Sequence, residues 1–265
     1  MSKNNKNQTS VYVVANTKGG AGKSTLSSMI LPALIGTSKP INVFEIDDNN
    51  RTKLTSSHVN FKSIKIEQSE DAIGDVSFDL IAGENVVNIV DCGGGNDTLA
   101  VLRKIHENNL MGLTYFVPTN DDIEQFDNVK QTINEIKKID PTSRVYLVFN
   151  RISVMEEDKI KKQFVAFFGD ETYSIEGRID EIKNLIEDMF FVENTSLFGI
   201  LKNIYGKTLL DSFIDGKDMV DNLEKYKVEW SALGRERYKI NLGVAKFAKS
   251  VVELVEQLAP FKKAL

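Results

Sequence analysis

Residues 18–25 read Lys18-Gly19-Gly20-Ala21-Gly22-Lys23-Ser24-Thr25. This stretch lies between an apolar run at residues 11–15 and a helix-compatible segment at residues 24–35. A strand, a glycine-rich turn and the start of a helix direct several backbone N–H groups and the positive end of a helix dipole at one point, which suits a phosphate group. The spacing therefore predicts a phosphate-binding P-loop between the first strand and the first helix.

The residues of this loop have separate expected parts in binding a nucleotide. Glycine lets the backbone wrap anionic oxygens with no Cβ in the way. Lys23 can reach the β- and γ-phosphates, while Ser24 is placed to hold Mg²⁺ and Thr25 to contact the α-phosphate. The expected nucleotide-binding residues of the loop are Gly19, Gly20, Ala21, Gly22, Lys23, Ser24 and Thr25.

The loop departs from the usual pattern G-x-x-x-x-G-K-[ST], which would need glycine where the chain has Thr17. It carries instead a second lysine, Lys18, five residues before Lys23. The sequence K-G-G-x-G-K-S-T resembles the deviant Walker A motif of the ParA/MinD family of dimeric ATPases. In that family the first lysine reaches across a dimer interface to the partner's nucleotide. The resemblance implies this catalytic role for Lys18, ATP and Mg²⁺ as cofactors, and an ATP-dependent homodimer.

Length and composition predict one α/β domain over residues 1–265. Hydrophobic residues make up 42% of the chain and charged residues 27%, with no shift in composition along it. No apolar run approaches the roughly 20 residues of a membrane span, and residues 1–9 are polar, which favours a disordered lead over a signal peptide. A lone cysteine, Cys92, excludes an intrachain disulfide. We therefore expect a cytoplasmic protein.

A short β-rich run at residues 41–47 ends in carboxylates. In open parallel sheets, groups at the carboxyl ends of strands face the ligand crevice. The family shows D-x-D-P-Q here, so the resemblance places Asp47 on the acidic position associated with orienting the attacking water. Glu45 replaces the first aspartate, while Asp48 and Asn49 replace Pro and Gln. The alternative interpretation of Asp47 and Asp48 is a solvated acidic loop.

A second, nearly continuous apolar run at residues 86–91 ends in Asp91 and is followed by Cys92 and three glycines. A buried central strand that ends in aspartate beside a P-loop is the Walker B arrangement, in which the carboxylate meets Mg²⁺ directly or through water. Ser24 and Asp91 are therefore the expected metal-binding residues. The family commonly has D-T-P-P here, so the glycines imply a looser switch. We interpret Cys92 as a small side chain under the nucleotide.

The rest of the chain alternates strands and helices and then becomes mainly helical after residue 151. Asn150 ends the last clear core strand and matches the family's base-contacting asparagine, although an asparagine that caps a loop would look the same. The element order predicts a doubly wound, mostly parallel sheet flanked by helices. Further expected strands are 61–66, 113–117, 145–151 and 190–192, and further expected helices are 70–82, 97–108, 121–139, 155–168, 178–188, 196–205 and, with breaks, 217–258.

The net charge is −5, so any contact with nucleic acid must come from a local basic patch. ParA-like proteins bind DNA without sequence preference through basic residues near the dimer edge, and such contacts depend on salt. The alternative is that these residues are ordinary solvated lysines and arginines. The candidate residues are Lys202, Lys207, Arg235, Arg237, Lys239, Lys246, Lys249, Lys262 and Lys263.

The resemblance implies a ParA-like switch for plasmid or chromosome partition. Two subunits sandwich ATP, the dimer binds DNA, and slow hydrolysis, stimulated by a partner protein, releases it. The alternatives are a MinD-like positioning ATPase on a membrane, a small-molecule phosphotransferase or ligase on the same fold, and a module that binds ATP without cleaving it. Pro260 interrupts the C-terminal apolar stripe, so we expect that stripe to pack on the domain and not to bind a membrane.

Overall fold

The computed structural model describes residues 9–48 and 54–265. Within these residues, seven strands form one sheet in the order β3-β2-β4-β1-β5-β6-β7, and every neighbouring pair is parallel. The predicted α/β class is confirmed, and the sheet is wholly parallel where a mostly parallel one was expected. The strands are β1 (Ser10–Val14), β2 (Ile41–Ile46), β3 (Val59–Ile64), β4 (Val87–Cys92), β5 (Thr114–Thr119), β6 (Arg144–Ile152) and β7 (Asp188–Glu193).

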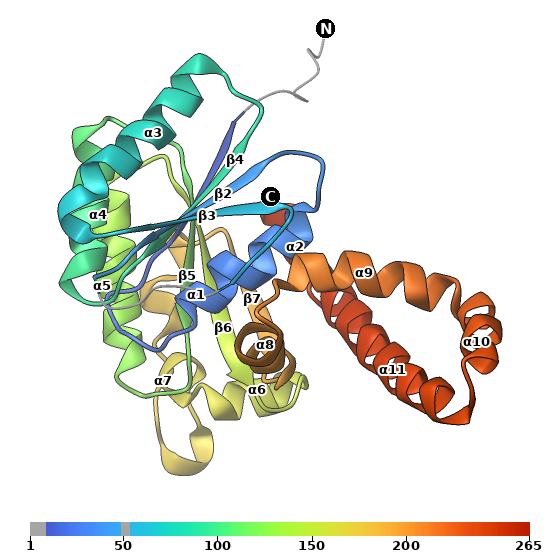
Figure 1. The fold of residues 1–265 in the computed structure, drawn as a ribbon. Coiled ribbons are helices and arrows are strands. Elements are labelled where there is room, and N and C mark those ends of the chain that lie inside the picture. Colours follow the sequence, from blue (N-terminus) through green and yellow to red (C-terminus); the bar gives the residue numbers. More distant parts are fainter. Residues whose placement is uncertain (1–8, 49–53) are drawn as a thin grey trace, which may run out of the picture.

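Helices cover both faces of the sheet, which makes three layers (Figure 1). One face is covered by α3 (Ser69–Ala82), α4 (Asn96–Glu107), α5 (Gln125–Ile139), α6 (Glu157–Gln163) and α7 (Val165–Phe168). The other is covered by α1 (Lys23–Thr25), α2 (Leu31–Ile35), α8 (Leu197–Ile200) and parts of α9 (Leu209–Asp221) and α11 (Arg235–Gln257). Because both faces are buried, the central strands read as continuous apolar runs in the sequence.

Strand β1 lies at the centre and shows how one sequence serves both layers. Val11 and Val13 belong to the core on one face, while Tyr12 and Val14 belong to the core on the other. The chain leaves β1 toward β2, β3 and β4 on one side and later continues to β5, β6 and β7 on the other. The carboxyl end of β1 is therefore the switch point of the sheet, where ligands bind in folds of this kind.

Three helices project from the sheet as an arm: α9, α10 (Leu223–Ala232) and α11 (Figure 1). Helices α9 and α11 pack closely, since a Cβ added to Gly216 would lie 3.2 Å from the Cβ of Ala248. The predicted helical region began at residue 217, but α9 begins at Leu209, where Thr208 caps it by accepting a hydrogen bond from the Asp211 N–H.

The base of this arm is tied to the segment that precedes β3. The Thr55 N–H donates to the Gly206 carbonyl at 2.9 Å. The Ser57 N–H donates to Asp211 Oδ1 at 3.1 Å, and His58 Nδ1 lies 3.0 Å from the same oxygen. This tether joins two segments about 150 residues apart in the sequence.

The C-terminal segment packs on the sheet, as expected. Four apolar residues at the end of α11 are buried, and Phe261, in the 3₁₀ segment Ala259–Ala264, stacks on Phe190 with ring centroids 4.3 Å apart. The Tyr12 hydroxyl donates to the Leu265 carbonyl at 2.9 Å. In the part of the chain that the structure describes, every helix is too short or too polar to cross a membrane.

Two predictions about local structure were wrong. Residues 178–188 form 3₁₀ turns at Ile179–Glu181 and Lys183–Leu185 and not a helix, because their apolar side chains recur every three residues, which is the 3₁₀ period. Of the predicted disordered lead, residues 1–8 lie outside the described residues. Thr9, however, is buried, and its hydroxyl donates to the carbonyls of Asp79 and Glu84.

Other boundaries shifted for identifiable reasons. Helix α5 begins at Gln125 and not at residue 121, because Asn120 and Asp122 accept backbone hydrogen bonds two residues ahead and form turns. The predicted helix 155–168 breaks at Phe164 into α6 and α7. The helix after the P-loop contains a π-helical turn at Leu26–Ile30.

Phe149 is the centre of the core under α6 and α7. Its side chain is fully buried and contacts the rings of four other phenylalanines at centroid distances from 4.8 to 5.4 Å. We expect Phe149→Ala to lower the free energy of unfolding by about 3–5 kcal/mol, since it leaves a cavity that the neighbouring rings only partly fill. Urea unfolding measures this. The control is Phe78→Ala, at a side chain that is 65% exposed, and it should change the free energy of unfolding by less than about 0.5 kcal/mol. Equal effects of the two substitutions would contradict the central place of Phe149 in this core.

Candidate nucleotide-binding site

The P-loop lies between β1 and α1, as predicted. Gly20 and Gly22 adopt positive φ angles of 76° and 103°, which side chains with a Cβ rarely adopt. At Gly22 there is also no room, because an added Cβ would lie 1.8 Å from Asn150 Nδ2. At this position glycine is required by the contact with strand β6 as well as by the turn.

Lys23 lies inside the loop. Its side chain is buried, and its ammonium group donates to the carbonyls of Asn16 at 2.9 Å and Lys18 at 3.0 Å. Burial lowers the pKa of Lys23, and the neighbouring carboxylate of Asp91 opposes that shift. The loop therefore surrounds a buried cation.

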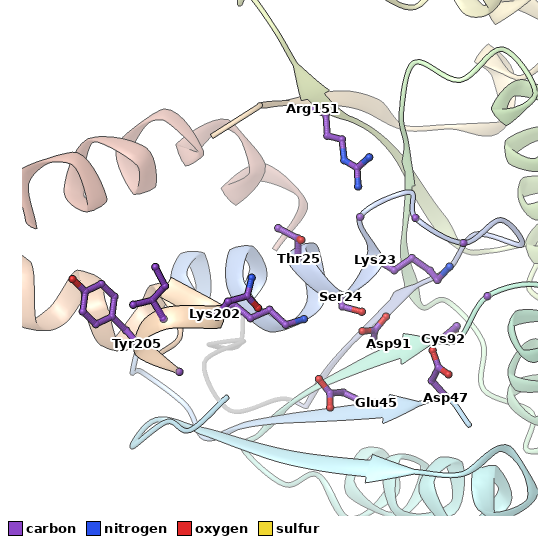
Figure 2. A pocket seen from close by; sticks show the side chains of 18 residues that line it. Lys23, Ser24, Thr25, Glu45, Asp47, Asp91, Cys92, Arg151, Lys202 and Tyr205 are labelled. Atoms are coloured by element: carbon purple, nitrogen blue, oxygen red, sulfur yellow. The ribbon is translucent and has the colours of Figure 1, made fainter. Parts of the chain in front are cut away.

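A cavity of about 840 Å³ opens over the P-loop (Figure 2). Of the predicted site residues, the cavity takes in the glycines of the loop, Lys23, Ser24, Thr25, Asp47 and Asp91, but Lys18, Ala21 and Asn150 do not line it. The lining residues are Gly19, Gly20, Gly22, Lys23, Ser24, Thr25, Glu45, Asp47, Asp91, Cys92, Gly93, Gly94, Arg151, Lys202, Asn203, Ile204, Tyr205 and Gly206.

Asp91 points into the cavity from the end of β4. Its Oδ2 accepts a hydrogen bond of 2.8 Å from the Ser27 hydroxyl, whereas its Oδ1 is buried without a partner. Burial raises the pKa of Asp91 to about 6, hydrogen bonding from Ser27 and Ser24 lowers it, and nearby Glu45 raises it further. A buried carboxylate with one oxygen that accepts no hydrogen bond is a strong candidate for a cation ligand.

The residues present fit a magnesium ion that is bound together with phosphates. Ser24 lies beside Asp91, and hydroxyl and carboxylate oxygens are ligands that Mg²⁺ prefers. Among the described residues, no group of three or more His, Cys, Asp or Glu side chains could hold a metal. Such a site would therefore have few protein ligands, which is how Mg²⁺ commonly binds beside substrate phosphates.

The acidic residues after β2 differ in their surroundings. Asp47 lines the cavity, as the sequence predicted. Asp48 accepts a hydrogen bond from the Ile66 N–H at 2.9 Å, so it anchors the end of β3 and does not line the cavity. Glu45 is buried and lies in register with Asp91 on the neighbouring strand. Asn49 lies outside the described residues.

Lys18 points away from the cavity toward the start of α5. Its ammonium group lies 2.7 Å from Glu124 Oε2 and 3.3 Å from Asp122 Oδ2. These ion pairs raise the pKa of Lys18. The predicted role of Lys18 at a partner's nucleotide stays a prediction, and within this chain the lysine is held by two carboxylates.

Asn150 supports the P-loop from behind. Its Nδ2 donates to the Ala21 carbonyl at 3.2 Å, and its Oδ1 accepts from the Arg151 N–H at 2.9 Å. The amide thus holds the loop against β6, which is the contact that excludes a side chain at Gly22. Its predicted contact with the adenine base stays a prediction.

The structure adds two parts of the site that sequence reasoning missed. Arg151 has a positive φ of 61°, unusual for a residue with a side chain, and Figure 2 shows its guanidinium directed toward the P-loop. Its position next to Asn150 at a strand end was the available signal. The opposite wall consists of residues 202–206, where Lys202, grouped by sequence with the basic surface residues, points into the cavity (Figure 2).

Cys92 lines the cavity as a buried thiol, and burial raises its pKa. A thiol held in its neutral form is a poor nucleophile and metal ligand. This agrees with the interpretation of Cys92 as a small side chain under the ligand.

Replacement of Asp91 by asparagine tests the electrostatics of the site. Folding raises the pKa of Asp91 from 3.8 to about 6, so ionisation of this carboxyl group destabilises the folded protein. The contribution of Asp91 to the free energy of unfolding is fully present below pH 3.8 and is lost as the pH rises through about 6. We expect Asp91→Asn to raise the free energy of unfolding in EDTA at about pH 7 by roughly 2–3 kcal/mol, with no gain near pH 4. Urea unfolding at both pH values measures the difference. An equal effect at the two pH values would contradict this account.

Comparisons with known proteins show which family has this fold. A profile of the CobQ/CobB/MinD/ParA nucleotide binding domain matches residues 12–261. A search of curated proteins finds no match. Apo McdA from Cyanothece has a TM-score of 0.54 at 9% identity, over 76% of this chain and 92% of that one. A McdA variant in complex with ATP has a TM-score of 0.53 at 11% identity, over 97% and 96%. MinD cell division protein from Aquifex aeolicus has a TM-score of 0.51 at 14% identity, over 78% and 90%.

At these identities the solved structures show a shared fold. The profile match extends from the third residue of β1 into the C-terminal 3₁₀ segment and so includes the P-loop, Asp47 and Asp91. The chain therefore belongs to the CobQ/CobB/MinD/ParA family of nucleotide-binding domains.

Proposed function

We propose that this protein is a ParA-like, ATP-dependent dimerising switch that hydrolyses ATP to ADP and phosphate and serves plasmid or chromosome partition. The observation that carries the proposal is one cavity in which Lys23 lies buried in the P-loop beside Asp91, whose Oδ1 has no partner. Asp47 lines the same cavity. These are the groups that phosphoryl transfer to water needs: a cradle for phosphate, a carboxylate for a metal and a carboxylate for the water.

Each side chain has a defined part in this reaction. The P-loop N–H groups and Lys23 bind the phosphates, and Ser24 and Asp91 hold Mg²⁺. Bound Mg²⁺ neutralises phosphate charge. Asp47 orients the attacking water by accepting a hydrogen bond from it. Turnover without an activating protein should be slow, on the order of 10⁻⁴ to 10⁻² per second, because a partner completes the set of positioning groups.

Lys18 is the residue through which dimerisation would act. Its pairs with Asp122 and Glu124 are partly exposed, and exposed ion pairs of this kind are weak. They can therefore be exchanged for contacts with a nucleotide phosphate in a partner subunit. In the free subunit, the same pairs keep the lysine ordered and out of its own cavity.

A DNA surface on the first turns of α11 is part of the proposal. Three of the nine basic candidates are paired with carboxylates: Lys207, Lys249 and Lys263. Arg235 and Lys239 are exposed and lie one helical turn apart on the same face of the arm. Two exposed cations so placed suit contacts with a phosphate backbone.

The membrane alternative has less support, because Phe261 and the apolar end of α11 are already buried against the sheet. A small-molecule phosphotransferase or ligase would need a second substrate in the cavity. It would not need Lys18 for assembly. A binding module would keep ATP affinity without turnover. These alternatives are separated by the assembly and hydrolysis measurements below.

The first test is light scattering of the purified protein with ADP and with a non-hydrolysable ATP analogue, each with and without plasmid DNA. We expect a dimer with the ATP analogue alone and binding of that dimer to DNA in low salt. A nucleotide-dependent dimer that ignores DNA would redirect the assignment to a membrane or protein surface. A monomer under every condition would overturn the switch and favour an enzyme acting on a small molecule.

Two variants test the catalytic assignment. We expect Asp47→Ala to lose about 10²-fold in ATP hydrolysis while it keeps ATP-dependent dimerisation, because it removes only the group that orients water.

We expect Lys18→Ala to keep ATP binding but to lose dimerisation or hydrolysis. Phosphate release and light scattering measure both. Unchanged turnover in Asp47→Ala would remove the role assigned to Asp47. Unchanged dimerisation and turnover in Lys18→Ala would remove the role assigned to Lys18.

A paired set of variants tests the DNA surface. The double change Arg235→Ala with Lys239→Ala should weaken binding of the ATP-analogue dimer to plasmid DNA and lower the slope of log K against log salt by about 2, since two phosphate contacts are lost. Lys249→Ala, at a lysine already 3.6 Å from Glu253 Oε1, is the matched control and should bind as the unchanged protein does. Equal binding by all three would place the surface elsewhere.

A further inference from the structure

The helix that follows the P-loop is not a regular α-helix. Between α1 and α2, the residues Leu26–Ile30 form a π-helical turn, in which the Leu31 N–H donates to the Leu26 carbonyl five residues back. Pro32 follows directly and has no N–H to continue the α-helical ladder. Widened turns of this kind frequently occur at functional sites.

This turn brings two buried hydroxyl groups to two carboxylates. Ser27 and Ser28 are at most 1% exposed. The Ser27 hydroxyl donates to Asp91 Oδ2 at 2.8 Å, and the Ser28 hydroxyl donates to Glu45 Oε1 at 3.3 Å. Two adjacent helical side chains normally diverge, but here both reach acidic groups of the sheet beneath the cavity.

The two carboxylates lie side by side. Glu45 on β2 is in register with Asp91 on β4, and the Ser63 hydroxyl donates to Glu45 Oε2 at 3.0 Å. Both Glu45 oxygens thus accept hydrogen bonds from serines, which hold this side chain in place. In Asp91 only Oδ2 is occupied, and its buried Oδ1 lacks a partner.

A serine in this position could simply satisfy its own buried hydroxyl through the nearest acceptor. The difference between the two carboxylate oxygens of Asp91 favours a role for Ser27 in orienting this side chain. Glu45 and Asp91 are neighbouring carboxylates that repel each other, and both line the cavity. That arrangement is stabilised by a divalent cation. The orientation of the Asp91 carboxylate then decides which oxygen faces the cation.

We propose that Ser27 is a positioning residue that occupies Asp91 Oδ2 and thereby directs Oδ1 to the Mg²⁺ of the bound nucleotide. The inference rests on the proposed function, because it needs a nucleotide site that uses Mg²⁺. Partners that orient a metal ligand in this way typically contribute about 10- to 100-fold in metal affinity. Ser27 does not line the cavity, so it acts through Asp91.

The test is Ser27→Ala, which removes the hydroxyl and leaves the turn and its packing. Binding of a fluorescent ATP analogue is titrated with Mg²⁺ and repeated in EDTA, and unfolding temperatures are recorded. We expect the Mg²⁺ concentration for half-maximal effect to rise at least about 10-fold, with analogue affinity in EDTA unchanged. Ser212→Ala is the control, because the Ser212 hydroxyl is also buried in a helix but has no partner; it should change neither quantity.

The possible outcomes separate the two proposals. An unchanged Mg²⁺ titration in Ser27→Ala, with the unchanged protein showing Mg²⁺-dependent binding, would overturn the role of Ser27 and leave the proposed function standing. A parallel loss of affinity in EDTA and in Mg²⁺ would also overturn it, because it would indicate a general defect of the loop. No nucleotide binding by the unchanged protein would overturn both.

Discussion

All groups of the nucleotide site depend on one constraint, which is that every strand of the sheet runs in the same direction. Parallel strands end at a common edge, so the P-loop after β1, Asp47 after β2, Asp91 in β4 and Asn150 in β6 meet there although they are far apart in sequence. An antiparallel partner next to β1 would place its end at the opposite edge. The register also sets Glu45 directly beside Asp91, so the spacing of the acidic groups is a property of the sheet.

The charged groups of the site are separated into an acidic part and a basic part. Three carboxylates line one end of the cavity, and the ammonium group of Lys23 is committed to carbonyls of its own loop. Burial makes the charged form of Asp91 unfavourable, which raises its pKa to about 6. A polyphosphate with its cation supplies positive charge to the carboxylates and negative charge to Lys23 at the same time. The site thus favours a paired ligand over either ion alone.

Sequence reasoning reached the features that are encoded locally. The P-loop, the apolar strands that end in Asp47 and Asp91, and the alternation of strands with helices are short-range patterns, and each predicts the structure found. The parts that were missed depend on distant contacts. The ion pairs of Lys18 join residues more than 100 positions apart, and the support that Asn150 gives the P-loop depends on the packing of β6. The wall at residues 202–206 carries no motif. The π-helical turn was not predicted, since residues 24–35 were expected to form one helix.

The tether between residues 55–58 and the base of the arm has a mechanical consequence. Strand β2 ends at Ile46, so the segment that leaves it carries Asp47 at the cavity and then meets Gly206 and Asp211 through Thr55 and Ser57. Gly206 itself lines the cavity, and Asp211 lies in the first turn of α9. A displacement of residues 55–58 must either break these bonds or carry α9 with it. The segment that enters β3 and the first turn of α9 are therefore held together at the edge of the cavity.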